Sequence, residues 1–400
     1  MSRLKVLMLT RLFPSKAFPT LGTFCLERAK ALSRHVDVRV MVPTPWFPAS
    51  MPGPSEWNKW SAVELHGKLE GGLSATYPRY LSIPKIATWS QGVAMTIAIR
   101  RNFLEDFKGW NPDVIDGHFA YPDGYASVKL AKYLKRPCLV TCHGSDLRLY
   151  PELPFAGTML RWTLKSADRV LSVSNSLRSK SIELGCNEQN AIFIPNGVDT
   201  EKFKPLNKVE CRQKLNLPLD EKIGICVAAL IDIKNQSLII KALHRLRYLQ
   251  LPLPYVIFLG EGPNRYRLEQ EARQLCVDDR IFWVCKRPHV EVATWMAASD
   301  WLLLSSLHEG WPTVYFEAMA CGRPILSTNV DSAKDAISSP DLGLVVEDYS
   351  PETFANALNK IAETDYDEDA IRRHAEAHSW SRWAEQALEV MESVVRATSA

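Results

Sequence analysis

Short apolar runs of strand length alternate with longer segments of helical periodicity in the first half of this 400-residue chain. Helical segments such as 24–34 and 125–134 fall between some of the runs. Strands that alternate with helices in this way predict a parallel sheet with helices on both faces. The strands expected in this half are Lys5–Leu9, Val36–Val42, Asp113–Asp116, Cys138–Thr141 and Val170–Val173.

The second half repeats this pattern, which predicts an α/β protein with two doubly wound, Rossmann-like domains. Proline and Asn-Gly interrupt the chain in Ile194–Asp199, so we expect a domain boundary there. Because ligands of such sheets bind beyond the carboxyl ends of the strands, the two domains would face each other across an interdomain cleft. The strands expected in this half are Ile223–Leu230, Tyr255–Leu259, Ile281–Cys285, Trp301–Ser305 and Pro324–Ser327.

Glu309 and Glu317, separated by seven residues, are the most informative polar positions. They follow the apolar run 301–305, and Pro312 between them suits the first position of a helix that would continue over 314–320. Glu309 would then lie in the loop after a buried strand, and Glu317 about one turn into the helix. Free N–H groups at the start of that helix could bind an anion or sugar hydroxyls, and the carboxylates could accept hydrogen bonds from a diol, which suits a sugar nucleotide. Judged by spacing alone, both glutamates could instead be exposed surface residues.

This segment, with Ala318-Met-Ala-Cys-Gly-Arg-Pro324 after it, resembles the donor-site motif of the retaining family-4 (group 1) glycosyltransferases. The resemblance covers almost the whole chain, and Asn196-Gly-Val-Asp199 matches the interdomain signature of the family. Residues 11–14 and 19–24 look most like those of bacterial teichuronic-acid and exopolysaccharide glycosyltransferases. The resemblance implies the GT-B fold and transfer of a sugar from a nucleotide sugar, with retention of configuration, no cofactor and no metal ion.

The resemblance also implies roles for the two domains. Residues 1–197 would form the acceptor-binding domain, joined by a returning terminal helix at about 379–400, and residues 198–378 would bind the donor. Trp380 and Trp383 are the expected anchors of that helix, and Asp199 is expected to cap local backbone at the hinge, where Asn-Gly offers a positive φ.

In the donor domain, Glu317 is expected to bind the ribose, Glu309 the sugar hydroxyls, and Lys234, just past a predicted strand, the phosphates. The helix-end amides would assist Lys234 in stabilising the charge of the departing diphosphate. Further donor-binding residues implied by the resemblance are Gly310, Thr313, Val314, Lys286, Arg287, Gly260 and Gly262. Lys286 and Arg287 fall where the family binds the nucleobase, although a solvated basic turn is the alternative.

In the acceptor domain, Gly22 and Thr23 belong to a loop where the family has a glycine that lets the backbone approach a ligand. His118 and His143 both follow predicted strands, and each resembles a family position near the transferred sugar or the acceptor. We prefer His143 as the catalytic histidine because Gly144 and Asp146 accompany it.

Two departures from the family pattern favour lower donor affinity. Ala228-Ala229 stands where the family usually carries Gly-Arg, so the second phosphate-binding cation is missing. Val330-Asp-Ser-Ala333 replaces a frequent Gly-Gly turn. These changes motivate an alternative interpretation, a non-catalytic partner that binds sugar nucleotides.

The cysteines and acidic runs favour neither disulfides nor a metal site. None of the nine cysteines forms a Cys-x-x-Cys pair, and Cys138, Cys142, Cys226 and Cys285 lie in apolar runs, so we expect reduced core thiols in a cytoplasmic protein. The Asp-x-Asp runs at 365–369 lie in a polar stretch and are expected to be solvated surface.

The uneven distribution of charge along the chain indicates which partners the protein could bind. Residues 1–200 carry 25 Lys+Arg and 16 Asp+Glu, a balance of +9, whereas the whole chain carries only +3. We expect a glycan or lipid-linked glycan acceptor, weak association with the anionic inner face of the plasma membrane, and no nucleic acid. Arg161, Lys165 and Arg169 would share one helical face beside Trp162 in this interaction. A small soluble acceptor is the alternative among enzymes.

Overall fold

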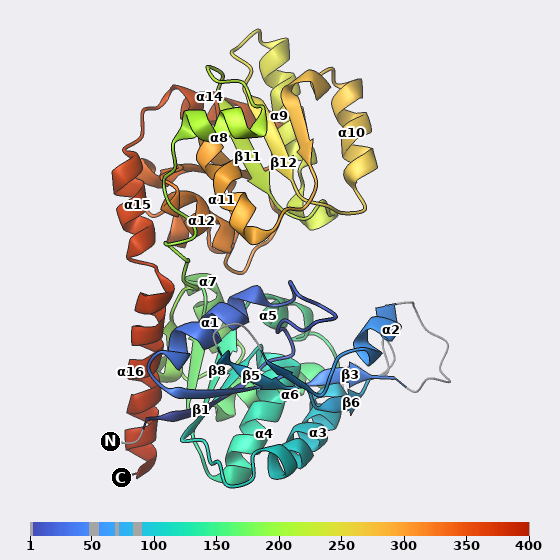
Figure 1. The fold of residues 1–400 in the computed structure, drawn as a ribbon, viewed down its shortest axis with the longest axis vertical. Helices are drawn as coiled ribbons and strands as arrows, with labels where there is room; N and C mark the ends of the chain where they lie inside the picture. Colours follow the sequence, from blue (N-terminus) through green and yellow to red (C-terminus); the bar gives the residue numbers. More distant parts are fainter. Residues whose placement is uncertain (1–2, 48–55, 69–71, 83–89, 400) are drawn as a thin grey trace. The chain divides into compact units, whose positions relative to one another are not determined.

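The computed structural model describes residues 3–47, 56–68, 72–82 and 90–399. Contacts divide the chain into two compact units, the first formed by Met1–Asn196 with Trp380–Ala400 and the second by Gly197–Ser379. Figure 1 shows that each unit is a sheet layered with helices. The prediction of an α/β protein with two doubly wound domains is therefore confirmed.

The sheet of the first unit has the order β10-β9-β8-β7-β1-β2-β5-β4 and is parallel except where β4 pairs with β5. A small second sheet pairs β3 with β6. The strands of this unit are β1 (Lys5–Leu9), β2 (Asp37–Met41), β3 (Thr44–Trp46), β4 (His66–Lys68), β5 (Ser74–Thr76), β6 (Arg79–Leu81), β7 (Val114–His118), β8 (Cys138–Cys142), β9 (Arg169–Ser172) and β10 (Ala191–Phe193).

Helices pack on this sheet because their apolar faces complete its core. The helices of the first unit are α1 (Thr23–Ser33), α2 (Glu56–Ser61), α3 (Gln91–Asp106), α4 (Tyr125–Leu134), α5 (Ser145–Leu149), α6 (Ala156–Ser166), α7 (Asn175–Glu183) and α16 (Trp380–Ser399). The last helix, α16, lies against α1 and contributes Trp383, Ala387 and Met391 to the same core as Val6 and Leu32.

The second unit contains a fully parallel sheet of order β13-β12-β11-β14-β15-β16. Its strands are β11 (Ile223–Val227), β12 (Tyr255–Leu259), β13 (Ile281–Val284), β14 (Trp301–Leu304), β15 (Ile325–Thr328) and β16 (Gly343–Val346). Its helices are α8 (Lys208–Leu215), α9 (Ser237–Tyr248), α10 (Arg265–Gln274), α11 (His289–Ala298), α12 (Thr313–Ala320), α13 (Ala333–Ala336), α14 (Pro351–Glu363) and α15 (Glu368–Glu376).

Each sheet has one switch point, where the strand order reverses. In the first unit the chain proceeds from β1 to β2 on one side and resumes with β7 on the other. In the second unit β11 leads outward through β12 and β13, and β14 resumes on its other side. Ligands of doubly wound sheets bind beyond the carboxyl ends of the strands at this point. The loops after β1 and β7, and those after β11 and β14, are therefore the places to examine.

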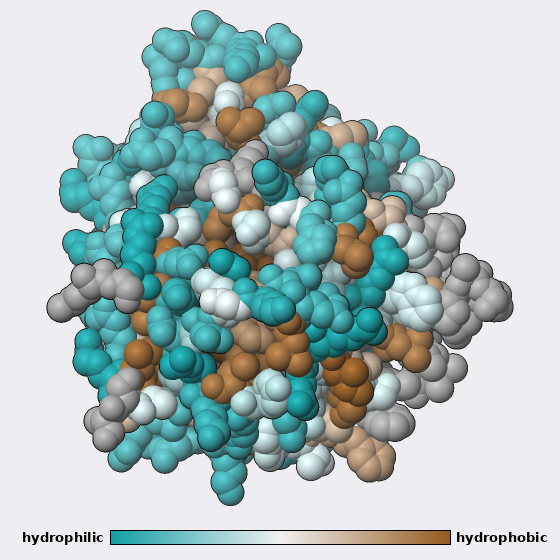
Figure 2. All heavy atoms as spheres, turned by 60° about the horizontal axis from the view of Figure 1, so that its bottom comes forward, coloured by the Kyte–Doolittle hydropathy of each residue, from teal (hydrophilic) through white to brown (hydrophobic). Residues whose placement is uncertain are grey.

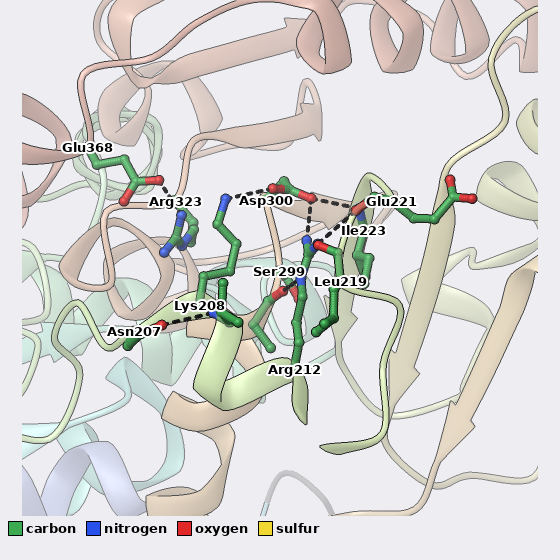
Figure 3. Close-up of polar contacts among 12 residues, drawn as sticks. Asn207, Lys208, Arg212, Leu219, Glu221, Ile223, Ser299, Asp300, Arg323 and Glu368 are labelled. Carbon is green, nitrogen blue, oxygen red and sulfur yellow. Dashed lines mark hydrogen bonds and ion pairs between the residues drawn. The ribbon is translucent and has the colours of Figure 1, made fainter. Parts of the chain in front are cut away.

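The opposite, amino end of β11 and β14 is held by an ionic cluster around Asp300 and the buried Arg212 (Figure 3). Asp300, just before β14, accepts hydrogen bonds from Arg212 Nη2 at 2.8 Å, Lys208 Nζ at 2.9 Å and the Ile223 N–H at 2.7 Å. Arg212 also donates to the carbonyls of Ala298 and of two residues in the loop before β11. This cluster fastens α8 to both strands.

The structure corrects several local expectations. Pro312 precedes α12 in an extended conformation and does not occupy its first helical position. Gly197 is not among the residues with positive φ, so no left-handed turn forms at Asn196-Gly197. Asp199 nevertheless caps the backbone as expected, because its Oδ1 accepts from the N–H groups of Glu201 and Lys202. Cys285 is exposed and so is not a core thiol.

The basic face expected on α6 is also incomplete. Arg161 and Lys165 are exposed on the helix, but α6 ends at Ser166 and Arg169 lies in β9. Trp162 packs edge-on against Tyr125 of α4, with 5.2 Å between the ring centroids, and so faces the protein.

Candidate functional site

The switch point of the second unit brings together Lys234 and Glu309. Lys234 ends a short turn after β11, Glu309 lies in the loop after β14, and the Lys234 ammonium forms an ion pair with Glu309 Oε1. Ser306 donates a hydrogen bond of 2.7 Å to the same oxygen. The side chains remain partly accessible, 23% for Lys234 and 12% for Glu309. Glu309 Oε2 has no hydrogen-bond partner among the described residues, so the pair retains capacity for a ligand.

The start of α12 lies immediately beyond this pair. None of the hydrogen bonds within the described part of the chain uses the backbone N–H groups of Gly310, Thr313 or Val314. These three residues are partly exposed. The first N–H groups of a helix carry partial positive charge and bind anions. The expected donor-binding residues of this segment thus lie together with the ion pair.

Glu317 is placed one turn into α12 but has a partner that the sequence did not suggest. Its Oε1 lies 3.0 Å from His289 Nε2, and its side chain is 12% exposed. The His289 ring packs edge-on against Phe203, with centroids 4.9 Å apart. His289 begins α11 one residue after Lys286-Arg287 and Pro288, so the loop that carries the expected nucleobase contacts is linked to Glu317 through this histidine.

The remaining donor-domain residues have different surroundings. Lys286 and Arg287 are exposed in the loop between β13 and α11. Gly260 and Gly262 lie in the loop after β12, where an added Cβ would come within 2.3 Å of the backbone oxygen of Ala228 or Leu230. These glycines permit close packing against the loop that follows β11. Among the described residues, the backbone hydrogen bonds of these two glycines do not involve Lys234 or Glu309.

In the first unit, His118 and His143 meet at the ends of the neighbouring strands β7 and β8. His118 Nδ1 lies 3.1 Å from His143 Nε2, and the Asp116 carboxylate lies 3.3 Å from His118 Nε2. Phe24 and Phe119 flank the His143 ring with centroids 5.0 and 4.5 Å away. Burial lowers the pKa of both histidines and outweighs the opposing effect of Asp116 on His118, while the nearby Arg28 guanidinium acts in the same direction as burial. Both imidazoles are therefore neutral at neutral pH.

Asp146 supports His143 and is not itself accessible. Its Oδ1 accepts hydrogen bonds from the N–H groups of His143 at 3.1 Å and Gly144 at 2.8 Å, and its Oδ2 accepts from Ala120 at 2.8 Å. Because the carboxylate is fully buried, it fixes the backbone of the two loops and cannot reach a ligand directly. Gly144 has φ 112, a conformation that glycine adopts without strain.

In the loop after β1, Gly22 packs closely against the backbone of Leu12, and its expected approach to a ligand stays a prediction. This residue has φ 64, and a Cβ there would lie 2.1 Å from the Leu12 carbonyl oxygen. It directly precedes Thr23, the first residue of α1, and α1 brings Phe24 against His143. The predicted acceptor loop and histidine are thus neighbours.

Two arginines belong to this region and were missed from the sequence, Arg28, which is buried, and Arg11, which is partly buried. Arg11, after β1, faces Asp123, after β7, with Nε and Oδ2 3.4 Å apart across the switch point. Arg28 donates from Nε and Nη2 to Asn196 Oδ1 at 3.0 and 2.7 Å. Arg11 and Asp123 each follow a strand at the switch point, a position that could have identified them. Arg28 lies within an ordinary amphipathic helix, where no local pattern marks it.

No group of three or more His, Cys, Asp or Glu side chains in the described ranges is arranged to hold a metal ion. The expected lack of a metal requirement stays a prediction. Asp365 and Asp367 are exposed, and Asp367 caps α15, in agreement with a surface role for the Asp-x-Asp runs. None of the helices described is both long and apolar enough to span a membrane.

Comparison with known families decides the class of protein. The sequence model of the Glycosyltransferase Family 4 domain matches residues 21–202, and that of the Glycosyl transferases group 1 domain matches residues 207–378. The chain belongs to the family-4, group 1 glycosyltransferases. The resemblance inferred from the donor motif is confirmed, and this protein is a glycosyltransferase enzyme.

Similar proteins agree with this assignment. A putative teichuronic acid biosynthesis glycosyltransferase, TuaC of Bacillus subtilis, is 26% identical over 361 residues, which cover 89% of each chain. Sucrose-phosphate synthase from Thermosynechococcus elongatus superposes with a TM-score of 0.77 at 18% identity, covering 99% of this chain and 100% of that one. HepE of Anabaena, in complex with UDP, gives a TM-score of 0.73 at 17% identity, covering 98% and 100%. The glycosyltransferase has the GT-B fold.

Proposed function

We propose that this glycosyltransferase transfers a sugar from a nucleotide sugar to a polysaccharide or lipid-linked acceptor in cell-surface polysaccharide synthesis, with retention of configuration and without a metal ion. The observation that carries the proposal is the ion pair of Lys234 and Glu309 at the switch point, beside the unbonded N–H groups at the start of α12. The similarity to TuaC, named for teichuronic acid biosynthesis, supports the acceptor class.

In this proposal the second unit binds the donor. Lys234 and the N–H groups of Gly310, Thr313 and Val314 stabilise the diphosphate, Glu309 accepts hydrogen bonds from sugar hydroxyls, and Glu317 accepts them from the ribose. The UDP bound by HepE supports a uridine nucleotide as the first donor to test. Lys286 and Arg287 line the nucleobase end.

The reaction follows from where the charges lie. The bond from the anomeric carbon to the diphosphate oxygen breaks, and a bond to the acceptor oxygen forms on the same face. The departing phosphate oxygen takes the proton of the acceptor hydroxyl, while Lys234 and the helix-end amides stabilise the charge that develops. Positive groups of the protein thus perform the task that a metal ion performs in other transferases.

A screen of thermal stability against nucleotides and nucleotide sugars tests the function. A ligand at 100 times its dissociation constant stabilises a protein by about 2.7 kcal/mol. We expect one nucleotide sugar to raise the melting temperature and then to be turned over equally with EDTA or with magnesium. Turnover that disappears with EDTA and returns with magnesium or manganese would refute metal independence. Stabilisation without turnover would favour the non-catalytic alternative.

Weak membrane association is part of the same proposal, and its surface is the exposed side of α3. Val93, Ile97 and Leu104 of α3 are 40%, 66% and 53% exposed, with Arg100 and Arg101 on the same helix. Figure 2 shows apolar surface among polar surface on the face turned forward. A helix with exposed apolar and basic residues suits an anionic lipid surface, to which each basic residue contributes about 1 kcal/mol.

Sedimentation with vesicles tests the association. We expect binding to anionic vesicles at low salt, loss of binding at high salt, and weaker binding of the Ile97→Glu variant. The control variant Tyr248→Glu changes a residue that is 72% exposed in the second unit and should bind as the wild type does. Equal, negligible sedimentation with anionic and neutral vesicles would refute the association and favour a small soluble acceptor.

A further inference from the structure

The buried contacts of Asp116, His118 and His143 determine how His143 can interact with a ligand. Asp116 lies in β7, His118 ends that strand, and His143 follows the neighbouring β8. Asp116 and His118 are buried, at 1% and 0% exposure, whereas His143 is partly exposed. The three side chains form a row that leads from the interior of the sheet to its carboxyl edge.

Neutral imidazoles carry one N–H donor and one acceptor nitrogen each. Between His118 Nδ1 and His143 Nε2, 3.1 Å apart, only one nitrogen can therefore carry the proton. The Asp116 carboxylate, 3.3 Å from His118 Nε2, places a proton on that nitrogen, because two lone pairs would otherwise face each other in a buried site. His118 Nδ1 is then the acceptor, and His143 Nε2 must donate to it.

The remaining nitrogen of His143 is consequently an acceptor. His143 Nδ1 has no partner among the hydrogen bonds of the described residues. Asp146 fixes the backbone of His143, and Phe24 and Phe119 confine its ring. We propose that Asp116 and His118 are positioning residues that hold His143 with its proton on Nε2, so that Nδ1 accepts a hydrogen bond from a hydroxyl of the sugar or acceptor. This inference rests on the proposed function only for the identity of the ligand.

The proposal restricts the role of His143 in catalysis. An acceptor nitrogen attracts a hydroxyl and repels a phosphate oxygen, so His143 orients a hydroxyl, and the diphosphate depends on Lys234 and the start of α12. A histidine in the opposite tautomer would donate to phosphate. The tautomer therefore distinguishes two kinds of site built from the same residues.

Nuclear magnetic resonance of the full chain labelled with ¹⁵N-histidine tests the proposal without any ligand. Long-range ¹H–¹⁵N correlations identify which ring nitrogen of each histidine carries the proton. We expect His118 and His143 to be protonated on Nε2 at neutral pH. Protonation of His143 on Nδ1 would overturn the proposal.

Variants test the role of Asp116. An amide can face His118 with either its oxygen or its NH₂, so Asp116→Asn should convert His143 to a mixture of tautomers. The matched control is Asp113→Asn at the opposite end of β7, where the carboxylate accepts only from the Lys5 N–H at 2.8 Å. This variant should keep the wild-type tautomer. An unchanged tautomer in a folded Asp116→Asn variant would show that Asp116 does not position His143.

Kinetics with the nucleotide sugar selected by thermal shift provide the functional measurement. Loss of one oriented hydrogen bond should lower kcat of Asp116→Asn about tenfold with the donor KM nearly unchanged. Reduced hydrolysis of the donor would assign the hydroxyl to the sugar, and reduced transfer alone would assign it to the acceptor. Equal kcat values for wild type and Asp116→Asn would contradict the proposal. Failure of every nucleotide sugar to react would refute the proposed function but leave the tautomer result intact.

Discussion

The strands β11 and β14 carry one ionic cluster at each end, and the two clusters differ in how completely their groups are paired. At the amino end, Asp300 accepts from two cations and a backbone N–H, and Arg212 is almost fully buried and donates to three carbonyls as well. At the carboxyl end, Lys234 and Glu309 form one ion pair, to which Ser306 adds a single hydrogen bond, and the structure gives these two side chains no other partner among the described residues.

The difference in pairing indicates that the amino-end cluster stabilises the fold, whereas the carboxyl-end pair can bind a ligand. A buried charge is costly unless all of its hydrogen-bonding capacity is used. The amino-end cluster meets that condition, whereas the carboxyl-end pair leaves an oxygen of Glu309 and nearby N–H groups available.

The largest change in stability is expected at the amino end of β11 and β14. Arg212→Ala leaves Asp300 and three carbonyls without their main partner, so the free energy of unfolding of the second unit should fall by about 3–5 kcal/mol. Arg267→Ala is the control, because its pair with Asp232 is exposed, 62% and 81%, and should contribute less than about 1 kcal/mol. Urea unfolding measures both. Equal losses of stability would show that the amino-end cluster has no special structural role.

At the carboxyl end of β11 and β14, a substitution of Lys234 should reduce catalysis more than stability. Lys234→Ala removes a cation that stabilises the departing diphosphate, and kcat should fall about 10²–10³-fold. Lys241→Ala, which removes a half-exposed lysine of α9 paired with Glu271, should retain kcat. Steady-state kinetics and urea unfolding of both variants test the contrast. A Lys234→Ala variant that is less stable but turns over normally when folded would show that Lys234 holds the fold and does not act in catalysis.

A smaller effect is expected for Glu317. Glu317→Ala removes a charged hydrogen-bond acceptor for the ribose, so donor affinity should weaken by about 1.5–3 kcal/mol while the fold is kept. Glu352→Ala removes an exposed carboxylate of α14 and should bind the donor as the wild type does. Calorimetric titration with the selected nucleotide sugar measures the donor affinity of both variants. Unchanged affinity in Glu317→Ala would remove Glu317 from the site.

The pH dependence of stability should have opposite signs for two buried aspartates. Burial opposes ionisation of Asp300, but hydrogen bonds from Lys208 and Ile223 lower its pKa. Wild type should therefore gain stability over Asp300→Asn as pH rises through about 4, where the unfolded carboxylate ionises. For Asp123, burial outweighs Arg11 and raises the pKa to about 6.

Asp123 is protonated in the folded state at pH values where it is already ionised in the unfolded chain. Wild type should consequently lose stability relative to Asp123→Asn as pH rises from about 4 to about 6. Urea unfolding at several pH values measures both differences. Curves for the two variants that run parallel would contradict the assignment of one aspartate to the fold and the other to the site.

Much of the fold is predictable from the sequence because its central strands are buried on both faces. Tyr255–Leu259 is an uninterrupted apolar run, and its predicted bounds match β12. Strand β4 (His66–Lys68) was missed because it is short, polar and antiparallel to its neighbour. Strand β16 (Gly343–Val346), at the edge of the second sheet, was also missed. Hydrophobic patterns mark strands that the core covers on both faces, and they give no signal for a short polar strand such as β4.

The sequence predicted individual residues of the candidate site but not the contacts between them. Glu309, Glu317, His118 and His143 follow from their places after strands or within a motif. Their partners depend on strand order, which brings His118 beside His143 through the pairing of β7 with β8. The contact of Glu317 with His289 joins residues of two helices and has no signature in sequence spacing.

A crystal structure of the glycosyltransferase with the nucleotide sugar selected by thermal shift would show where the donor binds. We expect the diphosphate within hydrogen-bond distance of Lys234 Nζ and of the N–H groups at the start of α12, with a sugar hydroxyl on Glu309 and the ribose on Glu317. The Arg212–Asp300 contacts should be unchanged. A diphosphate bound away from the carboxyl ends of β11 and β14 would contradict the account.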